Sequence, residues 1–428
     1  MNLNLSPKPN KYSNIIKNDI ILTIYFNTLM IYYYILICIF ESIFGILSYP
    51  FNFLFRTPYH EVPEIYYIKT KANDEIISKL PISKYKCPPW LVGPFIQTLV
   101  YYSIRSNNPT SFRREFIQMT DGVDVAIDIK DYKLSDTAPI VFICHGIGGG
   151  SDEPLIAKVS DICLEKGWRC IVYIRRGHQG TSLLPKTNSN LKPKIFPVHC
   201  DMEDMSAVVH HVNTKYPNSK KIIAGFSAGS NIAVKYLATA EFEKYKIVAG
   251  ISLCNGHNLN DLTNELEEKR PILNHLMTKN LKNVFRNRFH EIKHLCHIHH
   301  IDLNIKAALQ AKTARNFEFE LLPIYGYDKT EEELERYYLD NSCCHVIHDV
   351  KVPLLSIENR GDPCIARHLS NYVRNAAIQN ENIISIITER GGHLGWMEGW
   401  RQSWSVKIII SYIETVFTRA IVPMDDIR

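Results

Sequence analysis

The sequence predicts an α/β fold in which helices flank a mostly parallel central sheet. Short apolar runs alternate with helical stretches from residue 116 to about residue 420, and this alternation is typical of βαβ units. The alternation stops between about residues 255 and 347, where the sequence is helical, charged and rich in histidine. We therefore expect one α/β domain over 116–420, with a helical cap inserted at about 255–347.

The strands and helices are expected in a regular order. FIQMT and VAIDI form a strand pair around the turn Asp121-Gly122. Six apolar strands follow, and they are PIVFICHG, WRCIVYI, KKIIAGF, KIVAGISLC, VPLLSIE and IISIITE. Helices are expected at EPLIAKVSDICLEKG, from the N-cap Asp201 to His211 or beyond, at AGSNIAVKYLATA, from about 366 and from about 402. Residues 56–115, which mix Pro, Lys and aromatic side chains, are expected to be a structured lead-in.

The amino-acid composition and the net charge indicate a globular protein and argue against a nucleic-acid-binding or disulfide-rich one. The 428 residues are 46% hydrophobic and 22% charged, which is ordinary for a globular chain. The net charge of +5 comes without a long Lys/Arg block, so we expect no nucleic-acid partner. Eleven cysteines in so long a chain do not form a disulfide framework, although the spacing leaves open whether Cys343-Cys344 pairs with other cysteines. Nothing in the sequence fixes an oligomeric state.

The N-terminal region predicts a membrane anchor. Ile20–Phe40 contains no charged residue and has about the length that spans a hydrocarbon core. Glu41 interrupts it before a second apolar patch, so the anchor is expected within residues 20–55, after a short tail at 1–19. Three lysines precede the span and one arginine follows closely, which favours a type II orientation. The expected membrane is the endoplasmic reticulum or another endomembrane. A buried N-terminal helix is the alternative.

A nucleophile is predicted where the strand KKIIAGF ends. The next residues, GFSAG at 225–229, fit G-x-S-x-G in its meaningful context of strand, sharp turn and helix. Small residues on both sides let the backbone turn tightly and expose the Ser227 hydroxyl beside a helix N-terminus. An ordinary glycine-rich turn is the competing interpretation.

Partners for this serine follow in the chain order that the motif requires. The loop NRGDP after VPLLSIE supplies Asp362 as the acid, and the loop RGGH after IISIITE supplies His393 as the base. The glycine-rich loop HGIGGG follows the strand IVFIC. We expect the backbone N–H groups of Ile147 and Ala228 to hold an oxyanion. Such chemistry requires no cofactor and no metal.

These motifs resemble the YheT-like branch of the α/β-hydrolases, over roughly residues 85–400. The shared pieces are Gln97-Thr98, Asp121-Gly122, HGIGGGS, Arg176-Gly177, GFSAGSN, YGYDKTEEELERYY, VPLLSIENRGDP and GGHLGW. The resemblance implies an α/β-hydrolase fold with the triad Ser227, Asp362 and His393. It also implies a single-pass membrane esterase or lipase whose partners are a membrane and a lipid ester, either a phospholipid or a monoacylglycerol.

The chain departs from this family at three places. Ser230 replaces a second glycine after the nucleophile, which is expected to crowd the helix against the strand. Gly361-Asp362 replaces a pair of acids, so Asp362 is the only local acid. Pro154-Leu155 stands where an aromatic residue is usual, which leaves the substrate's shape open there.

Three alternatives remain from the residues. His199 and Asp204 fit H-x-x-x-x-D, a pattern of some acyltransferases, although a capped helix start explains it equally. His290, Glu291 and His294 fit the zinc-peptidase pattern H-E-x-x-H. The glycine that the extended zinc pattern needs is missing, and a cap helix is the favoured interpretation. A non-catalytic binding protein on the same fold is the third.

Overall fold

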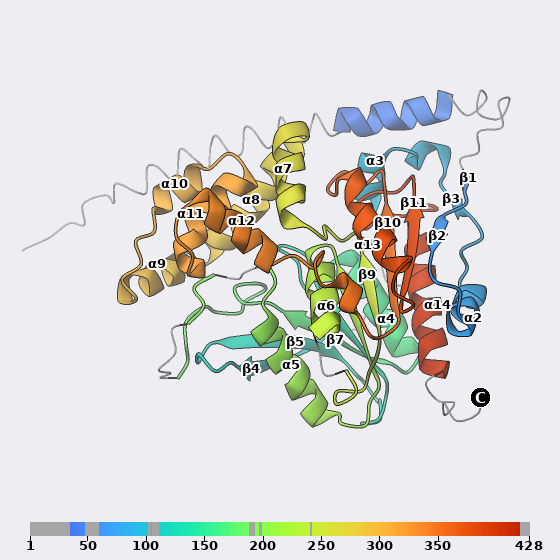
Figure 1. The fold of residues 1–428 in the computed structure, drawn as a ribbon, viewed down its shortest axis with the longest axis horizontal. Helices are drawn as coiled ribbons and strands as arrows, with labels where there is room; N and C mark the ends of the chain where they lie inside the picture. The colour runs from blue at the N-terminus through green and yellow to red at the C-terminus, as the bar shows by residue number, and fades with distance from the viewer. Residues whose placement is uncertain are drawn as a thin grey trace, which may run out of the picture.

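The computed structural model describes residues 35–47, 60–101, 104, 111–187, 193–196, 199–239 and 242–419. At its centre is a nine-stranded sheet (Figure 1). The order across the sheet is β2 (Glu64–Tyr66), β11 (Ile383–Thr388), β10 (Leu354–Asn359), β9 (Ile247–Leu253), β8 (Lys221–Phe226), β6 (Ile140–Cys144), β7 (Arg169–Ile174), β5 (Asp124–Lys130) and β4 (Arg113–Gln118). The six strands from β11 to β7 run parallel, whereas β2, β5 and β4 are antiparallel to their neighbours. The predicted mostly parallel sheet is confirmed.

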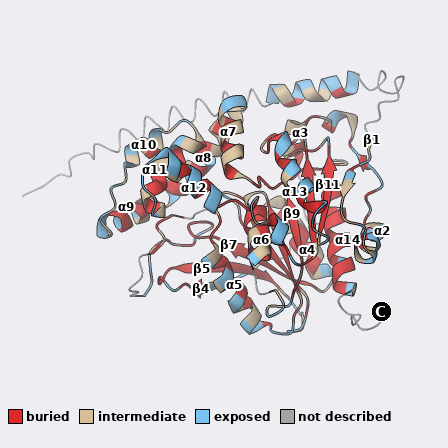
Figure 2. Ribbon diagram, viewed as in Figure 1, coloured by how far each residue is buried: buried red, intermediate tan, exposed pale blue. Residues whose placement is uncertain are grey.

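Helices cover both faces of this sheet. One face packs against α2 (Lys71–Lys79), α4 (Pro154–Glu165) and α14 (Trp404–Arg419). The other face packs against α5 (Met202–Lys215), α6 (Ala228–Thr239) and α13 (Ser370–Ala377), which follows the short turn η3 (Arg367–Leu369). The parallel strands are buried almost throughout (Figure 2), which explains why their sequences are apolar without alternation. The predicted helix that Asp201 caps is present, since the Asp201 side chain accepts from the N–H of Asp204 at 3.1 Å.

The region expected as a lead-in is part of the core. Strand β2 adds to the sheet edge beside β11, and β1 (His60–Glu61) pairs with β3 (Tyr85–Lys86). After η1 (Pro89–Leu91), helix α3 (Pro94–Tyr101) packs against the glycine-rich loop that carries His393. A three-residue edge strand has too little periodicity to be recognised in a sequence.

The segment between β9 and β10 is the expected helical cap. It contains α7 (Leu259–Lys269), α8 (Pro271–Asn287), α9 (Phe289–Ile298), α10 (Ile305–Gln310), α11 (Ala314–Tyr325) and α12 (Glu331–Asp340), then the turn η2 (Ile347–Asp349). Figure 1 shows α7 to α12 gathered at one end of the molecule. These helices pack in two hydrophobic clusters that also include residues outside the cap, such as Phe196 and Leu369, and Phe285 and Phe317 meet edge to face with ring centroids 5.9 Å apart. The cap therefore shares its hydrophobic clusters with neighbouring parts of the α/β domain.

A helix at residues 35–47 lies against η1 and α3. The Ser42 hydroxyl donates to the carbonyl of Trp90 at 3.0 Å, and the N–H of Ile96 donates to the Glu41 carboxylate at 3.2 Å. A side chain at Gly45 would meet the carbonyl oxygen of Pro89 at 2.0 Å, so glycine permits this close approach. Most of the other side chains of this helix are apolar and exposed, namely Ile35, Leu36, Ile39, Phe40, Ile43, Phe44, Ile46 and Leu47.

Two expectations from the sequence bear on this region and on the cysteines. Most of the predicted span Ile20–Phe40 lies outside the described residues, which begin at residue 35. Within the described ranges, no helix combines the length and the apolar character that crossing a bilayer requires. All eleven cysteines are described and free, Cys343 and Cys344 included, as expected for a chain without a disulfide framework.

Candidate active site

The turn between β8 and α6 holds Ser227 in a left-handed conformation, with φ of 55°. Glycine on either side makes the turn possible. A side chain at Gly225 would meet the Cα atom of Ser230 at 2.3 Å, and one at Gly229 would meet the carbonyl oxygen of Cys144 at 2.0 Å. Strand and helix therefore approach each other too closely for any other residue at these two places, and the turn projects the Ser227 hydroxyl at the carboxyl edge of the sheet.

Ser230, the first departure from the resembling family, is accommodated by hydrogen bonds. Its hydroxyl is fully buried and accepts from the N–H of Leu253 at 2.9 Å. The same hydroxyl lies 2.7 Å from the carbonyl oxygen of Gly225 and 2.9 Å from that of Leu253. The expected crowding is thus replaced by a polar link between α6 and strands β8 and β9.

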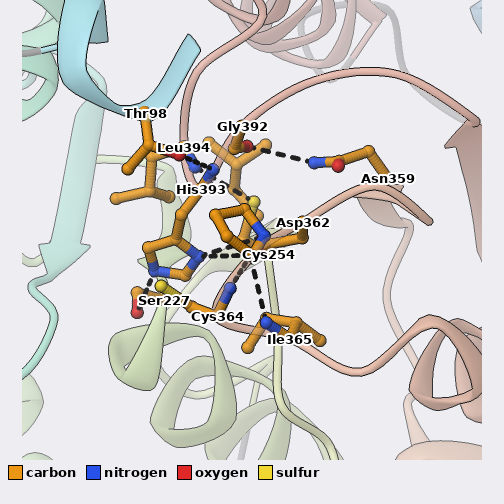
Figure 3. Close-up of polar contacts among 12 residues, drawn as sticks. Thr98, Ser227, Cys254, Asn359, Asp362, Cys364, Ile365, Gly392, His393 and Leu394 are labelled. Carbon is orange, nitrogen blue, oxygen red and sulfur yellow. Dashed lines mark hydrogen bonds and ion pairs between the residues drawn. The ribbon is translucent and has the colours of Figure 1, made fainter. Parts of the chain in front are cut away.

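Three side chains form a hydrogen-bonded chain at this edge (Figure 3). The Nε2 atom of His393 lies 2.8 Å from the Ser227 hydroxyl. Its Nδ1 atom lies 2.9 Å and 3.2 Å from the two carboxylate oxygens of Asp362. Strands β8, β10 and β11 each place one member of this chain just beyond their carboxyl ends. The structure therefore brings together the three side chains that the motifs singled out.

The surroundings of Asp362 fix its orientation and influence His393. One carboxylate oxygen of Asp362 accepts from the backbone N–H groups of Cys364, at 2.7 Å, and Ile365, at 3.0 Å. Burial opposes the charged form of His393, but the Asp362 carboxylate outweighs this effect and raises the pKa of the imidazole. The ring is thereby poised to take up a proton from a nucleophile.

Helix α3 holds the loop that carries His393 through hydrogen bonds. The N–H of His393 donates to the Thr98 hydroxyl at 2.9 Å (Figure 3), and the N–H of Met397 donates to the buried side chain of Gln97 at 2.7 Å. A side chain at Gly392 would meet the backbone nitrogen of Thr98 at 2.4 Å. Gln97-Thr98 was among the sequence pieces of the resemblance, but no sequence rule shows that it holds the histidine.

The two residues expected to donate to an oxyanion lie at the cavity that holds Ser227. Ile147 and Ala228 line the same cavity as Ser227 and His393. Ala228 begins α6, so its N–H is one of the first-turn donors without a partner inside the helix. Glu153 packs against the glycine-rich loop HGIGGG, and its carboxylate would overlap any side chain at Gly149.

No sequence pattern pointed to Glu153 as a residue of the site. Burial raises the pKa of its carboxyl group to about 7, against the opposing effect of the Gly150 N–H. The side chain lines the cavity that holds Ser227. A second carboxyl group, besides that of Asp362, therefore lies at the cavity that holds Ser227.

A cavity of about 690 Å³ opens above the serine, between sheet edge and cap. Its wall on the cap side is apolar and comes mainly from α7 and α8, through Leu259, Leu262, Leu266, Leu273, Leu276, Met277 and Leu281. The cavity also reaches Leu99 of α3 and Cys38 of the helix at 35–47. A cavity of this size and lining suits a long apolar chain.

The zinc pattern does not form a metal site in the described part of the chain. His290 and His294 are exposed on α9. Glu291 instead accepts from the Ser182 hydroxyl at 3.0 Å and from Arg288 at 3.1 Å. The one group with metal-like spacing in the described ranges joins Cys254 to Asp362 and His393, whose polar atoms already bond each other. The favoured interpretation of α9 as a cap helix agrees with this geometry.

The two residues of the acyltransferase pattern, His199 and Asp204, bind different partners. Asp204 is held in an ion pair by the buried Arg176, which also binds Asp121 at 2.7 Å. His199 turns away from it and hydrogen-bonds Glu318 of the cap helix α11. His199 and Asp204 therefore do not act as one catalytic pair.

Comparison with known proteins agrees with this geometry. The model of the alpha/beta hydrolase fold matches residues 139–399. The chain is 28% identical over 366 residues to monoacylglycerol lipase ABHD2 of Danio rerio, covering 81% of this chain and 84% of that one. It is 28% identical over 343 residues to phospholipase ABHD3 of Mus musculus, covering 77% and 75%. Among solved structures, the Pyrococcus furiosus esterase Pf2001 aligns over 68% of this chain and 90% of its own, at 16% identity and a TM-score of 0.40. The match to more than half of the chain shows that this protein belongs to the alpha/beta hydrolase fold family.

Proposed function

We propose that this protein is a serine hydrolase that cleaves carboxylic esters of lipids. The observation that carries the proposal is the hydrogen-bonded chain from Ser227 through His393 to Asp362, in a cavity with an apolar wall. The two relatives named as a monoacylglycerol lipase and a phospholipase support lipid esters as the substrate class.

The geometry defines the order of proton transfers. The Ser227 oxygen attacks the ester carbonyl carbon while its proton moves to Nε2 of His393, and Asp362 stabilises the resulting imidazolium. The N–H groups of Ile147 and Ala228 bind the oxyanion. As the tetrahedral intermediate collapses, the bond from carbonyl carbon to alcohol oxygen breaks, and the imidazolium gives its proton to the leaving alkoxide.

The second half of the cycle returns the enzyme to its starting state. Water attacks the acyl-serine and gives a proton to His393, and the fatty acid leaves as the proton returns to the Ser227 oxygen. No step requires a cofactor. An acyltransferase on the same fold would differ only in the acceptor, an alcohol in place of water.

The experiment that tests this proposal measures fatty acid release from a monoacylglycerol and from a phosphatidylcholine, both in detergent micelles. The full chain is expected to hydrolyse at least one of them, and Ser227→Ala is expected to reduce the rate to background. Adding glycerol distinguishes acyl transfer, because a transferase would pass the acyl group from Ser227 to a glycerol hydroxyl and form a new ester in place of free fatty acid. A folded wild-type chain without activity on either lipid would contradict the proposal and favour a binding protein.

We also propose that the chain is held at a membrane through its N-terminal region, in a type II orientation. The uncharged stretch Ile20–Phe40 supports this, together with the exposed apolar side chains of the helix at 35–47. Cys38 of that helix borders the cavity, so a bilayer on this side would lie next to the cavity that holds Ser227.

The membrane proposal is tested in microsomes that contain the full chain. The protein is expected to stay in the membrane pellet after an alkaline carbonate wash, and its main body is expected to be protected from added protease. Release by carbonate would contradict the anchor, and digestion of the main body would contradict the orientation.

A further inference from the structure

A polar pair interrupts the wall of the cavity. Nε2 of His199 and a carboxylate oxygen of Glu318 form a hydrogen bond, and both side chains line the cavity that holds Ser227. Glu318 is 2% exposed, and its other oxygen accepts from the hydroxyl of Tyr338 at 2.6 Å. Burial of such groups is costly unless they are paired. In largely apolar ligand cavities, a few placed polar groups are what orient the ligand.

Hydrogen bonds connect this pair to the nucleophile's helix. Asn231 follows Ser227 by one helical turn, so the two side chains share a face of α6, and Asn231 also lines the cavity. The Asn231 amide donates to the carbonyl of Asn341, and the Asn341 side chain accepts from the N–H of Cys200 at 2.9 Å. Cys200 adjoins His199. The polar pair therefore belongs to the same wall as the reactive serine.

A small recess adjoins the pair, and its lining mixes polar and apolar side chains, namely Ile147, Arg175, His178, Phe196, His199, Leu281, Val284, Glu318 and Tyr325. Its volume is about 20 Å³, which is enough for one water molecule or one hydroxyl group. His199 and Glu318 border both the recess and the main cavity, and so does Ile147, the expected oxyanion donor. A small polar group in this recess would thus lie close to the reacting ester.

We propose that His199, Glu318 and this recess form a subsite for a free hydroxyl group on the alcohol side of the ester. The inference rests on the proposed function and extends it to the substrate. Glu318 engages Nε2 of His199, and Nδ1 has no partner among the described residues, which leaves it for the hydroxyl. The leucine-lined wall of α7 and α8 takes the acyl chain. The subsite therefore selects esters with a free hydroxyl, such as monoacylglycerols and lysophospholipids, over esters of simple alkyl alcohols.

The test compares 1-palmitoylglycerol with propyl palmitate, which has the same carbon skeleton without the two free hydroxyl groups. Both esters are presented to the full chain in the same detergent micelles, and kcat/KM is measured for each. The wild type is expected to prefer the glycerol ester by about tenfold or more, the discrimination that a hydrogen bond to a charged or polarised group provides. Glu318→Gln and His199→Phe are expected to abolish the preference, through a fall of kcat/KM for the glycerol ester relative to propyl palmitate.

A matched control separates the subsite from general effects of substitution. Glu320 lies on the same helix α11 and pairs with Lys329 at 2.5 Å near the surface. Glu320→Gln is expected to keep the preference. Glu318→Gln can still accept the Tyr338 hydroxyl, so it tests the subsite even where His199→Phe lowers thermal stability.

Each outcome has a separate meaning. A preference that disappears in both subsite variants and survives in the control supports the inference. Equal rates for the two esters in the wild type, or a preference that persists in Glu318→Gln, would overturn it and leave the hydrolase intact. If the folded wild type hydrolyses neither ester, the proposed function is wrong and the subsite fails with it.

Discussion

Replacing Gly392 by alanine should disable the site without changing any reacting group. The new Cβ atom would lie 2.4 Å from the backbone nitrogen of Thr98. Ordinary contacts between such atoms are about 3.5 Å, so the loop must move by roughly 1 Å away from α3. His393 is the next residue, and its Nε2 atom lies 2.8 Å from the Ser227 hydroxyl. A misplacement of this size costs about 10²-fold in rate.

The assay for this prediction is kcat/KM on a small soluble ester, with thermal stability measured in parallel. Gly399→Ala is the matched control, because a side chain at Gly399 meets nothing within 4 Å. We expect Gly392→Ala to lose about 10²-fold in kcat/KM and Gly399→Ala to remain close to the wild type. Activity of folded Gly392→Ala within threefold of the control would refute the reasoning that α3 positions the histidine.

Three further predictions concern protons, packing and metal. Because the base must be neutral and the pKa of His393 is raised, kcat/KM should climb with pH through a midpoint above 6.5; a midpoint below that value would contradict the pairing with its carboxylate. Ser230→Gly leaves the buried N–H of Leu253 without its partner and puts glycine in a helix, so unfolding free energy should fall by about 2–4 kcal/mol, measured in urea; no loss would contradict the polar link. The double variant His290→Ala/His294→Ala, dialysed against a chelator, should keep its esterase activity, whereas a loss would revive the zinc hypothesis.

Sequence reasoning succeeded where short patterns decide the structure. The strands from β6 to β11 are apolar because helices bury both faces, and their order gave the parallel sheet directly. Ser227, Asp362 and His393 each stand just after one of these strands, so the fold's geometry was enough to expect them together.

The features of the site that could not be predicted from the sequence depend on contacts between segments that are far apart in the chain. His199 and Glu318 are 119 residues apart and meet only because the cap folds onto the sheet. Thr98 reaches His393 across 295 residues. The zinc pattern on α9 shows the converse, since its spacing was correct and the surrounding structure placed both histidines in solvent.

The central claim is that Ser227 is the nucleophile, and covalent labelling tests it most directly. The full chain is treated with a fluorophosphonate, digested, and the modified peptide is identified by mass spectrometry. We predict a single adduct on Ser227, slowed strongly in Asp362→Asn and absent in Ser227→Ala. An adduct on another residue, or no adduct on folded wild-type protein, would contradict the account.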